Sequence, residues 1–148
     1  MQNQTHKQAG FAAIEYTLAA PLMFLLIFAV AEFGRLLYQY NILTQAVRDA
    51  GRYLSNNARP GTTGIIELTD DNKTRTEKLL RYGDLTSNQL LLPNLNNAVI
   101  TYSSSGDLVS ISVSYPWQPI FASNLFDPDG QGMSLDFPLV ANYTMRAL

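Results

Sequence analysis

An apolar stretch near the N-terminus constrains the fold of this chain more than any other feature. Residues 11–31 are apolar or weakly polar except for a single acid, Glu15. At about 1.5 Å of rise per residue, a helix of this length spans about 30 Å, the thickness of the hydrocarbon core of a bilayer. The stretch therefore predicts a transmembrane helix that carries an ionisable side chain about one turn inside the membrane.

Composition limits what the rest of the chain can do. Of its 148 residues, about 90 follow the helical region, which is enough for one small domain. The formal net charge is -2 and no basic patch is present, so we expect no nucleic-acid partner. The chain has no Cys and its single His is His6, which leaves no His-based triad and no thiolate site. We therefore expect no catalytic residues, no metal, no cofactor and no enzymatic activity.

The segment before the apolar stretch is short and polar. Residues 1–10 contain no acid and carry Lys7, which favours a cytoplasmic location under the positive-inside rule. A secretory signal peptide is the alternative, because Ala29 and Ala31 have the small side chains of a cleavage site. The apolar run is longer than an ordinary signal sequence and continues into a helical pattern, which favours a retained helix.

The helix is expected to continue beyond the membrane as an amphipathic segment. Apolar positions recur at spacings of three and four residues and so share one helix face: Leu36, Tyr40, Leu43, Val47, Ala50 and Leu54. The same stripe can be followed back through Phe33. Polar residues occupy the opposite face: Gln45, Arg48, Asp49 and Arg52. The chain is therefore divided into a leader (1–10), a transmembrane helix (11–34), an amphipathic continuation (35–57) and a domain (58–148).

The C-terminal domain is predicted to be of mixed α+β type. Residues 74–82 indicate a short helix that Gly83 ends. Residues 98–103 and 108–115 predict two strands joined by a Ser/Gly/Asp turn, and the second strand alternates apolar residues with serines. We expect residues 116–119 to break that strand, because they contain two prolines.

Residues 135–146 are predicted to return as a third strand, with Pro138 near its beginning or on an edge. The expected fold is a long N-terminal helix packed on a small antiparallel sheet of about three strands. Tyr115, Trp117 and Phe121 either complete the core beneath the hairpin or form an exposed contact patch, and the core is the favoured interpretation.

Several short motifs in the first 53 residues occur together in a known family. Residues 10–16, Gly-Phe-Ala-Ala-Ile-Glu-Tyr, resemble the processing site of type IV pilin-like proteins, with Gly before the cut and Glu five residues after it. The longer segment resembles the N-terminal region of TadE-like pseudopilins of the tight adherence (Tad/Flp) pilus system. The matching features follow in order: Glu15-Tyr16, Pro21, the element Glu32-Phe33-Gly34-Arg35, and the Ala/Arg-rich residues 46–53.

The resemblance implies a processed membrane subunit. A prepilin peptidase would cut between Gly10 and Phe11, and Glu15, with Tyr16 beside it, would register the subunit by pairing with the new amino group of a neighbour's Phe11. Opposite charges attract strongly in a low-dielectric medium, which makes this pairing physically sound. The alternative is that Glu15 snorkels to the membrane interface. Pro21 should kink the helix, either as a flexible point for extraction from the bilayer or without functional effect.

The implied partners are the prepilin peptidase, other pilin or pseudopilin subunits, the inner-membrane assembly platform and membrane lipid. The implied location is the bacterial inner membrane, with a cytoplasmic N-terminus and a periplasmic C-terminal domain; entry into an extracellular pilus is left open. Two alternatives of other classes are an unprocessed, membrane-anchored binding domain and a tethered enzyme that uses carboxylates. Asp127 and Asp129 leave open a loose calcium site, although Pro138 stands where the last ligand of an EF-hand loop is required.

Overall fold

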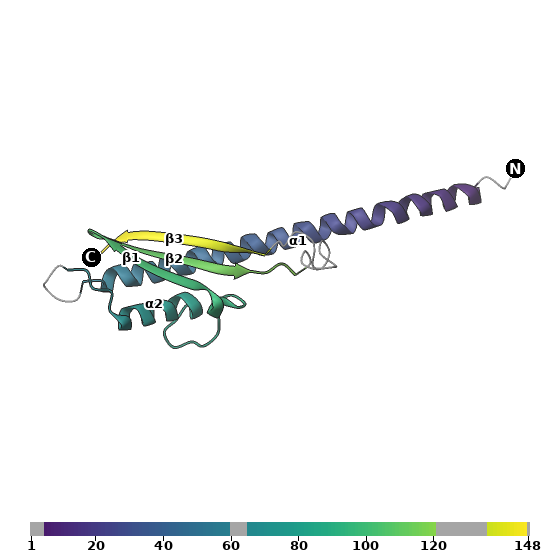
Figure 1. Cartoon of the computed structure of the whole chain (residues 1–148). Helices are drawn as coiled ribbons and strands as arrows, with labels where there is room; N and C mark the ends of the chain where they lie inside the picture. Colours follow the sequence, from purple (N-terminus) through teal and green to yellow (C-terminus); the bar gives the residue numbers. More distant parts are fainter. Residues whose placement is uncertain (1–4, 60–64, 121–135, 148) are drawn as a thin grey trace.

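The computed structural model describes residues 5–59, 65–120 and 136–147, with side chains from Phe11 onward. It contains a long helix, a short helix, a 3-10 turn and a three-stranded antiparallel sheet, which confirms the expected α+β class (Figure 1). The elements are α1 (Thr5–Asn57), α2 (Asp70–Tyr82), η1 (Leu95–Asn97), β1 (Val99–Ser105), β2 (Leu108–Trp117) and β3 (Phe137–Arg146).

The two halves of the helix α1 have different surroundings. Its C-terminal half lies along the sheet and α2, whereas its N-terminal half projects alone away from the domain (Figure 1). Of the described residues, only α1 is long and apolar enough to cross a membrane. The helix runs through Pro21 without interruption, and Thr17 donates a hydrogen bond from its hydroxyl to the carbonyl of Ala13 at 2.8 Å. A functional role for flexibility at Pro21 stays a prediction.

The sheet is a meander with strand order β1-β2-β3. β1 and β2 are joined by the two-residue turn Gly106-Asp107, and Gly106 adopts the left-handed conformation (φ 57°) that such hairpin turns require. The prediction that β2 ends before Pro116 is wrong, because β2 continues to Trp117. Pro116 lies opposite Pro138, next to the last residue pair of the two strands. The two prolines lack a backbone N–H, but at the end of the strands this removes few hydrogen bonds from the sheet.

The short helix α2 begins at Asp70, four residues earlier than predicted. Thr69 caps it by accepting a hydrogen bond from the backbone N–H of Asn72, and Asp70 and Asp71 place negative charge in the first turn. These capping signals extend the helix beyond its apolar stripe. At the other end, Gly83 has φ 74° and donates to the carbonyl of Leu79 at 2.8 Å, as predicted from a C-terminal glycine.

The core lies between α1, the inner face of the sheet and α2 (Figure 1). The alternation predicted for β2 is confirmed, because every second residue from Val109 to Trp117 is buried. Tyr115 and Trp117 are thus core residues, whereas Phe121 is outside the described residues. The main cluster includes Leu43, Val47, Ala50, Leu80, Leu92, Leu95, Ile111, Val113, Tyr115 and Trp117.

The predicted apolar stripe of α1 is correct from Leu43 onward and at Leu36, which packs against the core, but wrong at Tyr40 and Phe33. Tyr40 is exposed, as is Phe33, and the residues that face the domain are instead Gln39 and Glu32, which are 5% and 8% exposed. Hydrophobic periodicity misses them because a polar side chain enters a core when it finds partners there. The polar face of α1 lies at the surface as predicted: Gln45, Arg48, Asp49 and Arg52.

The helix α1 approaches the sheet closely at Gly51. A Cβ atom at this position would lie 2.6 Å from Cδ1 of Tyr143 and 3.4 Å from Cγ2 of Ile111. Gly34 lies on the same helix with no atom within 4 Å of an added Cβ, so the two glycines form a matched pair.

We expect Gly51→Ala to destabilise the domain and Gly34→Ala not to do so. Alanine generally favours a helix over glycine by about 1 kcal/mol, but at Gly51 the added methyl group overpacks the helix–sheet contact, at a cost of about 1–3 kcal/mol. The midpoint of urea unfolding in detergent, followed by the fluorescence of the single Trp, Trp117, should fall for Gly51→Ala alone. Equal midpoints for both variants would contradict the close packing of α1 on β3.

Candidate functional site

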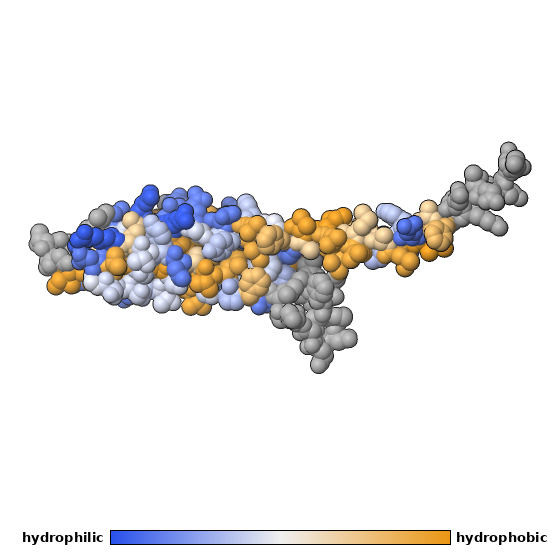
Figure 2. All heavy atoms as spheres, turned by 90° about the horizontal axis from the view of Figure 1, so that it is seen from above, coloured by the Kyte–Doolittle hydropathy of each residue, from blue (hydrophilic) through white to orange (hydrophobic). Residues whose placement is uncertain are grey.

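The projecting half of α1 presents apolar side chains that nothing in the described chain covers. Phe11, Leu18 and Val30 are each more than 70% exposed, and Glu15 and Tyr16 are exposed on the same segment. Figure 2 shows that hydrophobic residues predominate on the coloured part of this projection, with a hydrophilic spot near its outer end. A contiguous apolar surface of this size requires lipid or other apolar helices around it.

The predicted functional residues of the first 31 positions all lie on this projecting helix. α1 passes through Gly10 and Phe11 without a break, and Glu15, Tyr16 and Pro21 follow within three turns. The structure describes a single chain, so cleavage at Gly10 and pairing of Glu15 stay predictions. Glu32 comes 21 residues after Phe11, so it lies about 30 Å along the helix axis, at the far end of a membrane span.

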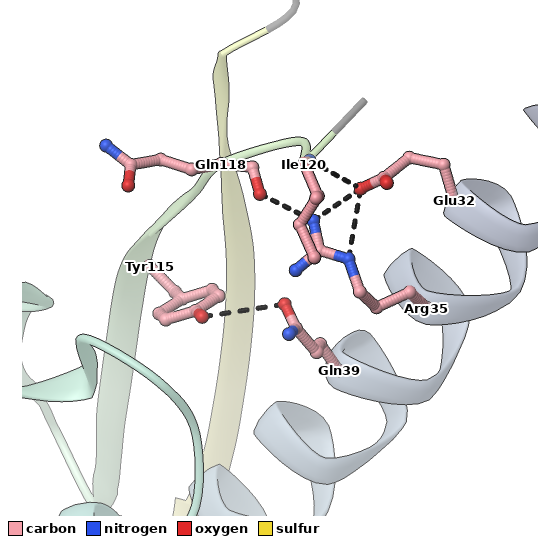
Figure 3. Close-up of polar contacts among 6 residues, drawn as sticks. All are labelled: Glu32, Arg35, Gln39, Tyr115, Gln118 and Ile120. Atoms are coloured by element: carbon pink, nitrogen blue, oxygen red, sulfur yellow. Dashed lines mark hydrogen bonds and ion pairs between the residues drawn. The ribbon is translucent and has the colours of Figure 1, made fainter. Parts of the chain in front are cut away.

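Glu32 and Arg35 join the helix to the end of the sheet. Arg35 donates from Nε to Oε1 of Glu32 at 3.0 Å and from Nη2 to the same oxygen, while Nη2 also donates to the backbone carbonyl of Gln118 at 2.5 Å (Figure 3). The backbone N–H of Ile120 donates to the same carboxylate oxygen at 3.3 Å. We refer to this cluster of Glu32, Arg35, Trp117, Gln118 and Ile120 as the clasp.

The guanidinium of Arg35 also lies over an aromatic ring. Its central carbon is 5.3 Å from the ring centroid of Trp117, a cation–π contact, and Trp117 packs against Phe137 with ring centroids 5.1 Å apart. A planar guanidinium can stack on a ring and donate in its plane at the same time, which a lysine ammonium cannot do. The side chain at position 35 thus makes two kinds of contact with the β2 end, a hydrogen bond and a cation–π contact, and pairs with Glu32 on its own helix.

Burial makes the ion pair of the clasp energetically important. The side chains of Glu32 and Arg35 are 10% and 26% exposed. The second carboxylate oxygen of Glu32, Oε2, is buried without a hydrogen-bond partner among the described residues, so Arg35 is the main compensation for that charge. A carboxylate in this environment is costly to leave alone.

One turn further along α1, Gln39 extends the polar contact into the core. The hydroxyl of Tyr115 donates to the carbonyl of Pro93 at 2.7 Å and lies 3.5 Å from Oε1 of Gln39 (Figure 3). Burial raises the pKa of the Tyr115 hydroxyl, and the charge of Arg35 opposes this shift only in part. The side chain of Tyr115 is therefore neutral in the core.

The sequence motif includes the two clasp residues on α1, but it does not predict their contacts with the end of β2. Glu32 and Arg35 belong to the recognised element, whereas the clasp contacts of Gln118 and Ile120 and the neighbouring contact of Gln39 with Tyr115 were missed. One signal was available: Glu32, Arg35 and Gln39 are spaced by three and four residues and so share a helix face. The other two contribute backbone groups, which no sequence pattern reveals. Within that motif Phe33 is exposed, and Gly34 has open space beside it.

The remaining candidate site lies elsewhere. The loop with Asp127 and Asp129 is outside the described residues. Within residues 5–59, 65–120 and 136–147, no group of three or more acidic or His side chains is placed to hold a metal ion.

The geometry defines a class of protein: a small α+β domain clasped to one half of a long helix whose other half exposes an apolar surface. Residues 10–52 match the family of TadE-like proteins, which confirms the resemblance and makes this helix a TadE-like segment. The match contains Gly10, Glu15 and the helix side of the clasp, and it ends before the sheet begins. No curated protein and no solved structure matches the chain.

We expect Arg35→Ala to lower the free energy of unfolding of the domain by about 2–3 kcal/mol, less than the roughly 3–5 kcal/mol for breaking a fully buried pair. The loss arises because Glu32 would keep a buried charge with a single backbone donor. Arg48→Ala, on the exposed face of the same helix, should change stability by about 0.5 kcal/mol or less. Urea unfolding of both variants in detergent measures the difference, and a midpoint for Arg35→Ala equal to that of Arg48→Ala would show that the clasp adds nothing.

Proposed function

We infer that this protein is a minor pilin or pseudopilin that acts in the assembly of a Tad-type pilus. The observation that carries the proposal is the TadE-like match, because it includes the helix whose apolar half no other described residue covers. The proposal is that of an assembly component that works by association and without catalysis or a cofactor.

In this proposal, α1 crosses the bacterial inner membrane once, with its N-terminus in the cytoplasm and the domain in the periplasm. A prepilin peptidase removes residues 1–10 by cleaving between Gly10 and Phe11. An ionised carboxylate inside the bilayer costs about 2.5–3.5 kcal/mol or more, and a neighbour's new N-terminal amine near Glu15 offsets that cost. The carboxylate therefore favours contact between subunits at one register.

The domain follows the helix in this mechanism. The clasp and the core fix the sheet to the C-terminal half of α1. Contacts that position the membrane helix of a subunit therefore also position its domain. The partners proposed are the prepilin peptidase, other pilin or pseudopilin subunits and the inner-membrane assembly platform. Membrane lipid surrounds the projecting half before assembly.

Processing is tested by the N-terminal residue of the mature protein. Intact and peptide mass spectrometry of the protein from membranes should give a chain that starts at Phe11. Gly10→Leu should leave the chain at full length, because a bulky residue does not fit the position before the cut. Ala13→Leu, which adds the same bulk three residues after the predicted bond, should be processed normally.

Other termini would point to other classes of protein. A wild-type chain that starts at Met1 would identify an unprocessed, membrane-anchored domain, and one that starts soon after Ala31 would identify a cleaved secretory signal. Normal trimming of Gly10→Leu would show that the predicted cleavage site is wrong.

The assembly role of Glu15 is tested separately. Glu15→Ala and Glu15→Gln should still insert into the membrane, since each removes a charge from the apolar segment, but both should assemble poorly. Thr17→Ala is the matched control, because it removes a polar group two residues further along the same helix. Pilus assembly is scored by electron microscopy and by the amount of subunit in sheared fractions; normal piliation by the Glu15 variants would make its carboxylate dispensable.

A further inference from the structure

The end of the sheet nearest the projecting helix is apolar and exposed. Ile120, just after β2, is 58% exposed, and Phe137, the first residue of β3, is 44% exposed. Pro116, Trp117, Pro138 and Phe137 line an open hollow of about 230 Å³ at this end, together with Gln118 and Asp136. We refer to Ile120, Phe137 and the two prolines as the rim.

Contacts of the clasp fix the level of the rim along α1. The backbone N–H of Ile120 bonds to Glu32, and Phe137 packs on Trp117, which lies over Arg35. The rim is therefore held beside the turn of α1 that contains Glu32 and Arg35. This turn lies about 30 Å along the helix from Phe11, one thickness of the hydrocarbon core.

The opposite end of the sheet has a different chemistry. At the β1–β2 turn, Asp107 pairs with Arg59 at 2.6 Å and with Arg146 at 3.1 Å. Leu108 and Trp117 are nine residues apart on β2, so these charged groups lie about 30 Å from the rim. The sheet thus has one apolar end beside the apolar helix and one charged end away from it.

We propose that the rim is a lipid-contacting surface that rests in the headgroup and upper acyl region of the membrane crossed by α1. Its occupant is phospholipid, because the rim continues the uncovered apolar surface of the helix at the level where the hydrocarbon core ends. Aromatic and proline side chains with neighbouring polar backbone groups suit this interfacial region. The domain therefore meets the membrane at two places, through α1 and through the β2–β3 end, which limits its tilt.

This inference rests on the insertion of α1, so the experiment measures both. The chain has no Cys, and single Cys residues carrying a spin label are introduced as Ile120→Cys, Phe137→Cys, Leu108→Cys and Leu22→Cys. Leu108 is the matched control, since it is 47% exposed on the same sheet but lies at the charged end. The full chain is reconstituted in phosphatidylethanolamine/phosphatidylglycerol vesicles, and collision rates with oxygen and with a water-soluble nickel chelate are compared.

The label at position 22 should show the highest ratio of oxygen to nickel collisions, those at 120 and 137 an intermediate ratio, and that at 108 the ratio of a label in water. Equal ratios at 137 and 108, with position 22 inside the bilayer, would overturn the lipid contact and leave the membrane anchor intact. A ratio typical of water at position 22 would overturn both. The emission of buried Trp117 checks that each labelled chain is folded, and labels of variants whose emission shifts are moved to Pro116 and Pro138 at the same end.

Discussion

The structure depends on one ion pair at the point where α1 changes its surroundings. Before Glu32 the helix exposes apolar side chains in every direction, and beyond Arg35 it buries one face against the sheet and α2. A lone helix cannot hold a domain at a fixed angle, and an apolar contact alone is non-directional. The clasp supplies direction, because the guanidinium of Arg35 bonds to Glu32 and to the carbonyl of Gln118 and lies over the ring of Trp117.

The packing beyond the clasp continues the same attachment. Gln39 and Tyr115 carry polar contact one turn further, and Gly51 lets the sheet approach the helix backbone at the other end of the contact. The two ends of the helix–sheet interface are therefore held differently, one by the clasp and the other by close packing at Gly51 together with the ion pair of Arg59 and Asp107. This division suits a domain of about 90 residues, whose single core supplies only a small net stability.

Most of the fold could be predicted from the sequence, because its signals are periodic. The apolar run gave the helix, the alternation from Val109 to Tyr115 gave β2, and Gly83 gave the end of α2. The prediction is wrong where a hydrogen-bond partner allows a polar side chain to be buried. Tyr40 is expected in the core, but Gln39 is buried instead, because its amide lies beside the hydroxyl of Tyr115. For the site, Glu32 and Arg35 were found by family resemblance, but Gln118 and Ile120 contribute a backbone carbonyl and a backbone N–H, which carry no residue-specific signal.

The placement of β3 bears on how such a protein is made. Strand β3 packs on α1, and Tyr143 lies against Gly51, so α1 and β3 close the core together although they lie far apart in the sequence. During synthesis the inner face of α1 stays incompletely covered until β3 has emerged. A chain truncated before Phe137 would hold a membrane helix and a hairpin with no finished core, and it would be a ready substrate for quality-control proteases. Completion of the core is thereby coupled to the synthesis of β3.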